Sequence, residues 1–219
     1  MPDLITPAQF HQSEGVGDWR VLATCVATRV SIASFAQGAR LLERLSGLTE
    51  GSACQPEADL RPGSVTIRLA FADTGAPSNS DVELARAISS AAAEMGLALD
   101  CLSLQEVMLA IDAMSIPTVM QFWRAVLGYV AKGEEDLVDP YAVSPWIWFQ
   151  QMDAPRTERN RIHVDIYVPY EKAQERIAAA IAAGGRVVTA EHAPAWWVLA
   201  DPEGNEACIG TRTEFEAPA

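Results

Sequence analysis

His163 and Asp165 are the residues in this sequence whose types and spacing best suit acid–base chemistry. They stand one residue apart in the apolar run 162–168, which is typical of a β-strand. Side chains two residues apart on a strand share one face of the sheet. A carboxylate on that face can fix the tautomer of an imidazole, which transfers protons near neutral pH. The spacing therefore indicates a proton-transfer pair, although a hydrogen-bonded histidine inside a domain would show the same pattern.

The strand that carries this pair belongs to a repeat within residues 104–212. The first copy is predicted as a strand at 107–111, a helix at 115–127 ended by Gly128, and strands near 129–130, 141–143 and 146–150. The second is predicted as a strand at 162–168, a helix at 170–183 ended by Gly184, and strands at 187–188, 196–200 and 206–209. Each copy is β-α-β-β-β, and the two copies are expected to pack together because neither closes its own core. Asp201 to Asn205 predicts the tight turn of a hairpin.

The first half of the chain has a different order of expected elements. Thr6 and Pro7 open a short helix, and strands follow at 19–22 and 25–30. Ser31 or Ser34 begins a helix with Phe35 in its buried stripe. Residues 51–62 are predicted as a loop and 65–71 as a strand. A capping box at Ser80–Glu83 opens the last helix, which runs to about Gly96. The fold class is therefore α+β, with an antiparallel sheet bearing helices on one face (domain 1–99) and paired modules forming a cupped sheet (domain 103–213).

Residues 4–97 resemble the pterin-4a-carbinolamine dehydratase family. The motifs are Trp19, Phe35, Pro56, the strand 65–69 and the segment 78–88. The resemblance implies an active site built on a His-His-Pro run and a later histidine, positions that hold Cys54-Gln55-Pro56 and a residue near Ala72 here. Asp81 matches the family's polar set. The resemblance thus makes Cys54, Gln55 and Asp81 candidate ligand-binding residues, although a carboxylate at a helix start also complements the helix dipole.

Residues 104–212 resemble the glyoxalase/bleomycin resistance/extradiol dioxygenase superfamily, also called vicinal oxygen chelate. The motifs are Phe122-Trp123 with Leu127-Gly128-Tyr129, the run 160–165, the run 184–188 and the run 201–206. The resemblance implies four inward positions, two from each module, which hold metal ligands in metal-dependent members. These fall on Met108, on Trp148 or Gln150, on His163 and on Cys208. Met and Trp are poor ligands for hard or borderline ions, so we expect no catalytic metal and no other cofactor.

These assignments give a candidate site in the second half of the chain. If the protein is an enzyme, His163 is the expected acid or base, with Cys208 beside it and Asp165 as the orienting group. The expected ligand-binding residues there are Met108, Trp148, Gln150, Arg161 and Trp197. Aromatic side chains on a cupped sheet suit a flat ligand.

Composition excludes several other partners. The net charge is −13, with 16 basic residues scattered among 29 acidic ones, so nucleic acid and anionic membranes are not expected partners. No run approaches the length of a membrane span, and the start of the chain lacks the pattern of a signal peptide. The four cysteines are far apart, which favours a reducing, cytoplasmic location.

The sequence therefore predicts a homodimeric, glyoxalase-like protein that binds a small molecule. Its chemistry, where there is any, would be that of a metal-independent lyase or isomerase, and it is joined to a degenerate pterin dehydratase-like domain. Two alternatives stay open. One is a 4a-hydroxytetrahydrobiopterin dehydratase that acts through the first domain. The other is a non-catalytic binding or dimerisation protein.

Overall fold

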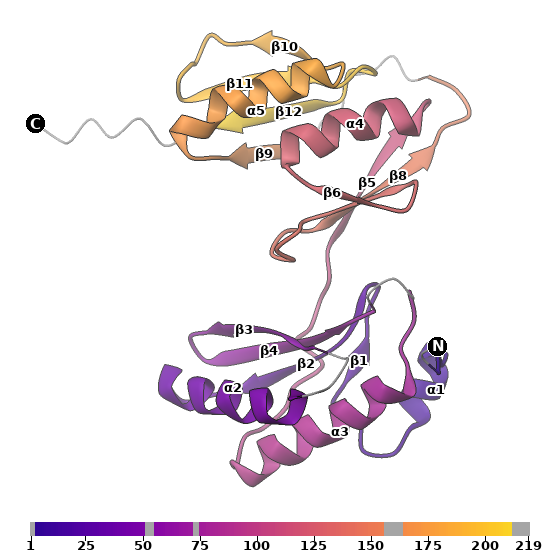
Figure 1. Ribbon diagram of the computed structural model, residues 1–219, viewed down its shortest axis with the longest axis vertical. Helices are drawn as coiled ribbons and strands as arrows, with labels where there is room; N and C mark the ends of the chain where they lie inside the picture. The colour runs from indigo at the N-terminus through magenta and orange to yellow at the C-terminus, as the bar shows by residue number, and fades with distance from the viewer. Residues whose placement is uncertain (1–2, 51–54, 72–74, 156–163, 212–219) are drawn as a thin grey trace, which may run out of the picture. The chain divides into compact units, whose positions relative to one another are not determined.

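The computed structural model describes residues 3–50, 55–71, 75–155 and 164–211 (Figure 1). The chain divides into two compact units, Met1–Glu106 and Val107–Ala219. Both units combine helices with sheets, which confirms the α+β class.

The N-terminal unit is one antiparallel sheet with its longer helices on one face. The sheet has the order β1-β2-β4-β3, and α2 and α3 cover the same side of it (Figure 1). Its elements, in chain order, are α1 (Pro7–Gln12), β1 (Arg20–Val21), β2 (Cys25–Ser31), α2 (Phe35–Thr49), β3 (Glu57–Arg61), β4 (Ser64–Ala70) and α3 (Asn79–Glu94).

Hydroxyl side chains begin the helices of this unit. Thr6 opens α1 through a capping box with Gln9, and the Ser34 hydroxyl accepts a hydrogen bond from the Gln37 amide at the start of α2. The predicted capping box at Ser80 is wrong, because Ser78 is the extended residue before α3 and Asp81 is its third helical position.

Two further expectations for this unit are corrected. The predicted loop 51–62 contains β3, whose alternating charged residues lie at a sheet edge, where charges are common. Residues 51–54 of that segment lie outside the described ranges. Phe35 is 65% exposed rather than buried, because it is the first residue of α2 and the core-facing stripe begins at Gly38 and Leu41.

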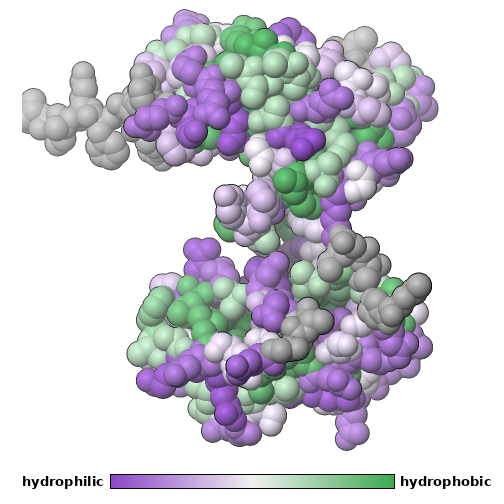
Figure 2. All heavy atoms as spheres, viewed as in Figure 1, coloured by the Kyte–Doolittle hydropathy of each residue, from purple (hydrophilic) through white to green (hydrophobic). Residues whose placement is uncertain are grey.

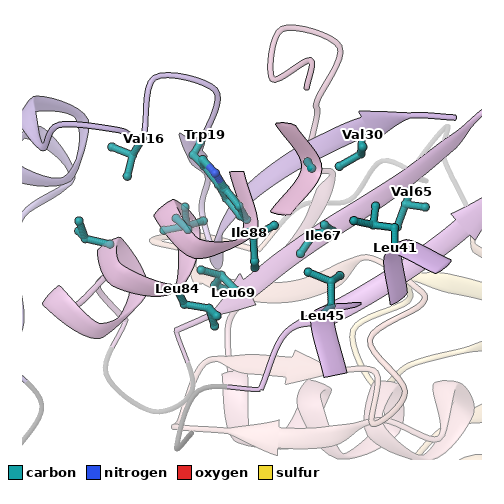
Figure 3. Packing of buried hydrophobic residues seen from close by; sticks show 14 of the residues in the cluster. Val16, Trp19, Val30, Leu41, Leu45, Val65, Ile67, Leu69, Leu84 and Ile88 are labelled. Atoms are coloured by element: carbon teal, nitrogen blue, oxygen red, sulfur yellow. The ribbon is translucent and has the colours of Figure 1, made fainter. Parts of the chain in front are cut away.

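The core of the N-terminal unit lies between the sheet and its helices. Figure 3 shows Leu41 and Leu45 of α2 and Ile88 of α3 converging on Ile67 and Leu69 of β4. Trp19 is fully buried, and its indole nitrogen donates to the Ser89 hydroxyl at 2.9 Å. A tightly packed interior of this kind fixes how the helices lie on the sheet.

The C-terminal unit contains two β-α-β-β-β modules, as the repeat predicts. The first module consists of β5 (Met108–Ala113), α4 (Ile116–Leu127), β6 (Val130–Lys132), β7 (Asp136–Val138) and β8 (Trp146–Gln151). The second consists of β9 (Val164–Tyr167), α5 (Tyr170–Ala182), β10 (Arg186–Thr189), β11 (Trp196–Ala200) and β12 (Glu206–Gly210). The sheet orders are β5-β8-β7-β6 and β10-β11-β12-β9, and in each sheet the first and last strands of the module are parallel neighbours.

One predicted strand of the first module is misplaced. Residues 141–143 form a turn in which Asp139 accepts backbone hydrogen bonds from Tyr141, Val143 and Ser144, while the strand itself is β7. A carboxylate that satisfies three backbone amides provides an alternative to strand pairing. The pattern of apolar residues alone did not reveal this turn.

The two modules share one hydrophobic core, to which both helices contribute. Phe122 and Trp123 of α4 are buried together with Ile177 of α5 and Leu199 of β11. A Cβ atom at Gly185 would collide with the Phe122 ring, so this glycine permits the close approach of α4. Apolar and polar residues are interspersed over the surface seen in Figure 2. In the described part of the chain, no helix has the length and apolar character needed to cross a membrane.

Candidate functional site

Strand alternation gives each sheet of the C-terminal unit a side turned away from the buried core. In the first sheet, Leu109, Ile111, Ile147 and Phe149 belong to or pack against the core. The intervening residues lie on the other side, which we call the first face: Met108, Ala110, Asp112, Lys132, Asp136, Trp146, Trp148 and Gln150. In the second sheet the equivalent residues, which we call the second face, are Asp165, Tyr167, Arg186, Trp196, Val198, Ala200, Glu206, Cys208 and Gly210.

The first face combines two tryptophans with a polar end. Trp148 is 37% exposed and has the small residue Ala110 as its partner on β5. Asp112 and Gln150 are partners one step further along the same two strands. The predicted ligand-binding residues Met108, Trp148 and Gln150 therefore do lie on one face. The combination of aromatic surface with amide and carboxylate groups suits a flat ligand with polar substituents.

The opposite edge of the first face carries a cation. The Lys132 ammonium lies over the Trp146 ring, 4.6 Å from its centroid. Asp136 is the strand partner of both Lys132 and Trp148. Its carboxyl pKa is raised, chiefly by burial and further by the charge of Glu135, while Lys132 acts in the opposite direction. At this edge the charges of Lys132, Asp136 and Glu135 therefore influence one another, and Lys132 lies against an aromatic ring.

The second face brings together two of the three predicted catalytic residues. Asp165 of β9 and Cys208 of β12 are direct partners in a parallel pair, and Val198 is the next residue across. Asp165 is exposed and Cys208 is partly buried. The third residue, His163, lies outside the described residues, as does Arg161. The positions of both are therefore expectations from the sequence.

Trp197 does not lie where the sequence predicts. It belongs to the buried core with Leu199 and Ile209, whereas Trp196 lies on the second face and is 39% exposed. The expectation that Trp197 binds a ligand is therefore wrong. The expected and observed bounds of this strand agree, but residues 196–200 are all apolar, so the sequence pattern does not show which alternate side chains face the core.

A buried carboxylate holds the hairpin that carries Cys208. Asp201 is fully buried and accepts hydrogen bonds from the Trp123 indole at 3.0 Å and from the backbone amides of Glu203 and Asn205, each at 2.9 Å. The Glu203 carboxylate in turn accepts from the Met114 and Ser115 amides at the start of α4, both at 2.8 Å. The turn thereby links the second sheet to the helix of the first module.

The predicted residues of the N-terminal unit are placed differently. Asp81 is buried, and its Oδ2 accepts from both the amide and the hydroxyl of Ser78, each at 2.7 Å. Gln55 donates to the Thr49 carbonyl oxygen at 3.3 Å. Cys54 lies outside the described residues. The two described side chains are thus engaged with nearby backbone, and the pterin dehydratase-like assignment stays a prediction.

A metal ion would find few ligands in the described part of the chain. No group of three His, Cys, Asp or Glu side chains gathers there. Asp165 and Cys208 would supply two ligands, and the sequence pattern predicts that His163 shares their face. Since residues 156–163 are outside the described ranges, the expectation of a metal-free site stays a prediction.

Several residues of the two faces were not predicted from the sequence. These are Asp112 and Lys132 on the first face, and Tyr167 and Trp196 on the second, where the registers of the sheets place them. Alternation from Met108 would have found Asp112, and alternation from Asp165 would have found Tyr167. Lys132 had no such signal, because its strand is only three residues long.

The greater part of the second unit matches the sequence model of a known family. Residues 108–210 match the sequence model of the glyoxalase-like domain. The C-terminal half contains a glyoxalase-like domain. This domain includes both faces described above and every strand from β5 to β12. No curated protein sequence matches the chain.

Solved structures similar to the glyoxalase-like domain cover about half of the chain. A glyoxalase/bleomycin resistance protein/dioxygenase family enzyme from Burkholderia phytofirmans PsJN is 22% identical, with 48% of this chain and 95% of that chain covered and a TM-score of 0.39. A glyoxalase/bleomycin resistance protein from Albidiferax ferrireducens T118 is 22% identical, with 48% and 96% covered and a TM-score of 0.38. The fosfomycin resistance protein FosX from Listeria monocytogenes, in complex with Mn(II) and 1S,2S-dihydroxypropylphosphonic acid, is 12% identical, with 50% and 90% covered and a TM-score of 0.38.

Proposed function

We propose that the glyoxalase-like domain binds a small organic molecule on its helix-free faces and acts on it as a metal-independent lyase or isomerase. The observation that supports this most directly is the pairing of Asp165 with Cys208 on the second face, within the matched family segment. His163 precedes Asp165 by two residues and, by alternation, shares its face.

Each residue has a distinct role in this proposal. His163 removes a proton from a carbon next to a carbonyl and returns it at a neighbouring atom, a step for which imidazole is suited near neutral pH. Asp165 fixes the tautomer of the imidazole. Cys208 lies across the strand pair from Asp165 and contacts the bound molecule. The tryptophans of the two faces hold the ligand by apolar contact.

Proton exchange tests the chemistry. The chelator-treated full chain is incubated with dihydroxyacetone in D₂O, and incorporation of deuterium next to the carbonyl is followed by NMR. We expect exchange above background, and the change His163→Gln should reduce it by about 100-fold, the lower range for general acid–base catalysis. His11→Gln is the matched control, because His11 lies in the N-terminal unit. Exchange that survives in His163→Gln, or that requires added Mn(II), would contradict the proposal.

We also propose that the protein is a homodimer. Tyr141 and Val143 are large side chains that remain 84% and 77% exposed on the C-terminal unit, and exposed apolar area of this kind commonly marks an interface. Light scattering coupled to size-exclusion chromatography should give twice the mass of the chain. A single-chain mass at the highest concentration that can be loaded would contradict this assembly.

A further inference from the structure

Two aromatic side chains of the second face stand in one row, and a third ring is stacked on one of them. The imidazole of His192 is stacked on the indole of Trp196, with ring centroids 4.2 Å apart and planes 25° from parallel. Trp196 is the strand partner of Gly210, and Gly210 is the partner of Tyr167 on the far side. The row therefore crosses three neighbouring strands, from Trp196 on β11, over Gly210 on β12, to Tyr167 on β9, and His192 is stacked at its Trp196 end.

Gly210 lets the Tyr167 ring lie against the sheet. A Cβ atom at Gly210 would come within 2.9 Å of Cε1 and 3.0 Å of Cδ1 of Tyr167, closer than real side chains approach. The tyrosine ring therefore occupies the space that any other residue at position 210 would fill. Tyr167 is 64% exposed and Trp196 39% exposed, so both rings present area to a ligand.

The charges around this row favour a cation. Asp165 and Glu206 are the acidic side chains of the second face, and Asp165 stands two residues before Tyr167 on the same strand. Arg186 is the one basic side chain on the described part of this face, and its guanidinium donates to the Asp201 carbonyl oxygen at 3.1 Å. Aromatic rings attract cations to their faces through the ring quadrupole.

We propose that Tyr167 and Trp196, with His192 stacked on one face of the indole, form an aromatic platform for a planar organic cation, such as an N-alkylated heteroaromatic ring. Side chains two residues apart on a strand are separated by about 7 Å, so a two-ring molecule on the platform reaches the Asp165–Cys208 pair. This inference rests on the proposed function and deepens it, since it names the class of molecule presented to that pair.

A charge series on one ring system tests the platform. The full chain is titrated by calorimetry near neutral pH with N-methylquinolinium, neutral quinoline and quinoline-2-carboxylate. We expect the cation to bind about tenfold more tightly than the carboxylate, in line with a desolvated cation–π contact. Trp196→Leu and Tyr167→Leu should each weaken binding of the cation about tenfold, while Tyr167→Phe keeps the ring and the affinity. Phe35→Leu is the matched control, because Phe35 is an exposed aromatic residue of the N-terminal unit, and this variant should bind like the parent.

Other outcomes would overturn the platform. These are equal or tighter binding of the carboxylate, loss of cation binding in Phe35→Leu, or unchanged cation binding in Trp196→Leu. If Trp196→Leu instead halves the molecular mass without weakening cation binding, the row is an interface between two copies rather than a ligand site. Failure of the proposed function can be distinguished from failure of the platform. Deuterium exchange in the parent and in His163→Gln tests the proposed function, whereas binding of the quinoline probes tests the platform.

Discussion

Three aspartates show two uses of the same side chain, one of them common to both units. Asp81, in the N-terminal unit, accepts hydrogen bonds from Ser78 at the start of α3. Asp201, in the glyoxalase-like domain, is fully buried within its own turn. Asp165 is exposed on the second face beside Cys208. A carboxylate at a helix start or inside a turn satisfies backbone amides, whereas one displayed on a strand away from the core is positioned to meet a ligand.

Replacing Asp201 should have the largest effect on stability. Asp201→Ala leaves the buried Trp123 indole and two backbone amides without their acceptor. We expect the free energy of unfolding of the C-terminal unit to fall by about 3 kcal/mol, as measured by urea denaturation. Asp153→Ala, at an exposed position of the same unit, is the control and should change it by less than about 0.5 kcal/mol. Equal losses in the two variants would erase the distinction between structural and displayed aspartates.

The cysteines of the two units can be compared through the pH dependence of stability. Burial raises the pKa of the Cys25 thiol from 9.0 to about 12, with further contributions from the charges of Glu106 and Glu57. The folded state therefore holds this proton above pH 9, where the unfolded chain releases it, so stability falls as pH rises. We expect a loss of about 1.4 kcal/mol per pH unit between about pH 9 and 12 from this group.

Denaturation at several alkaline pH values tests the cysteine prediction. Cys25→Ala should remove this part of the slope, and Cys208→Ala, on the second face, should leave it in place. Alkylation of the native protein near pH 8 should also spare Cys25, because the thiolate is the reactive form. Rapid labelling of Cys25 before unfolding would show that its thiol is not held in the protonated form.

The sequence predicts the order of helices and strands well, but it predicts less well which side chains of a strand face the core. Both modules and the Asp201 hairpin follow from apolar periodicity and turn residues. The expectation for Trp197 is wrong because residues 196–200 are all apolar, so their pattern does not show which alternate side chains face the core. Strand β7 escapes prediction because a three-residue strand carries almost no periodic signal. Tyr167, Gly210 and Trp196 come from three different strands, and only the register of the sheet brings them together.

Asp81→Ala distinguishes a helix cap from a catalytic group. Loss of the capping box should lower the free energy of unfolding of the N-terminal unit by about 1 kcal/mol, as measured by thermal or urea denaturation. Asp81→Asn, which keeps an acceptor oxygen, should lose less. We expect no dehydration of a 4a-hydroxytetrahydropterin by the parent protein that depends on Asp81. An activity that Asp81→Ala abolishes, at unchanged stability, would favour the dehydratase alternative instead.

Replacing Glu203 should have the smallest effect on stability, because its hydrogen bonds are exposed. They connect the second module to the first rather than holding a turn within one module. Its carboxylate satisfies the Met114 and Ser115 amides before α4 from 88 or more residues away. Glu203→Ala should lower the free energy of unfolding of the C-terminal unit by about 0.5 kcal/mol, and Glu203→Gln by less, because the amide keeps one acceptor. Amide hydrogen exchange gives the sharper measurement: protection should fall at residues 114 and 115 and remain at the Asp201 turn. If protection falls equally at both, the contact with α4 and the Asp201 turn form one cooperative unit, and Glu203 supports the hairpin that carries Cys208.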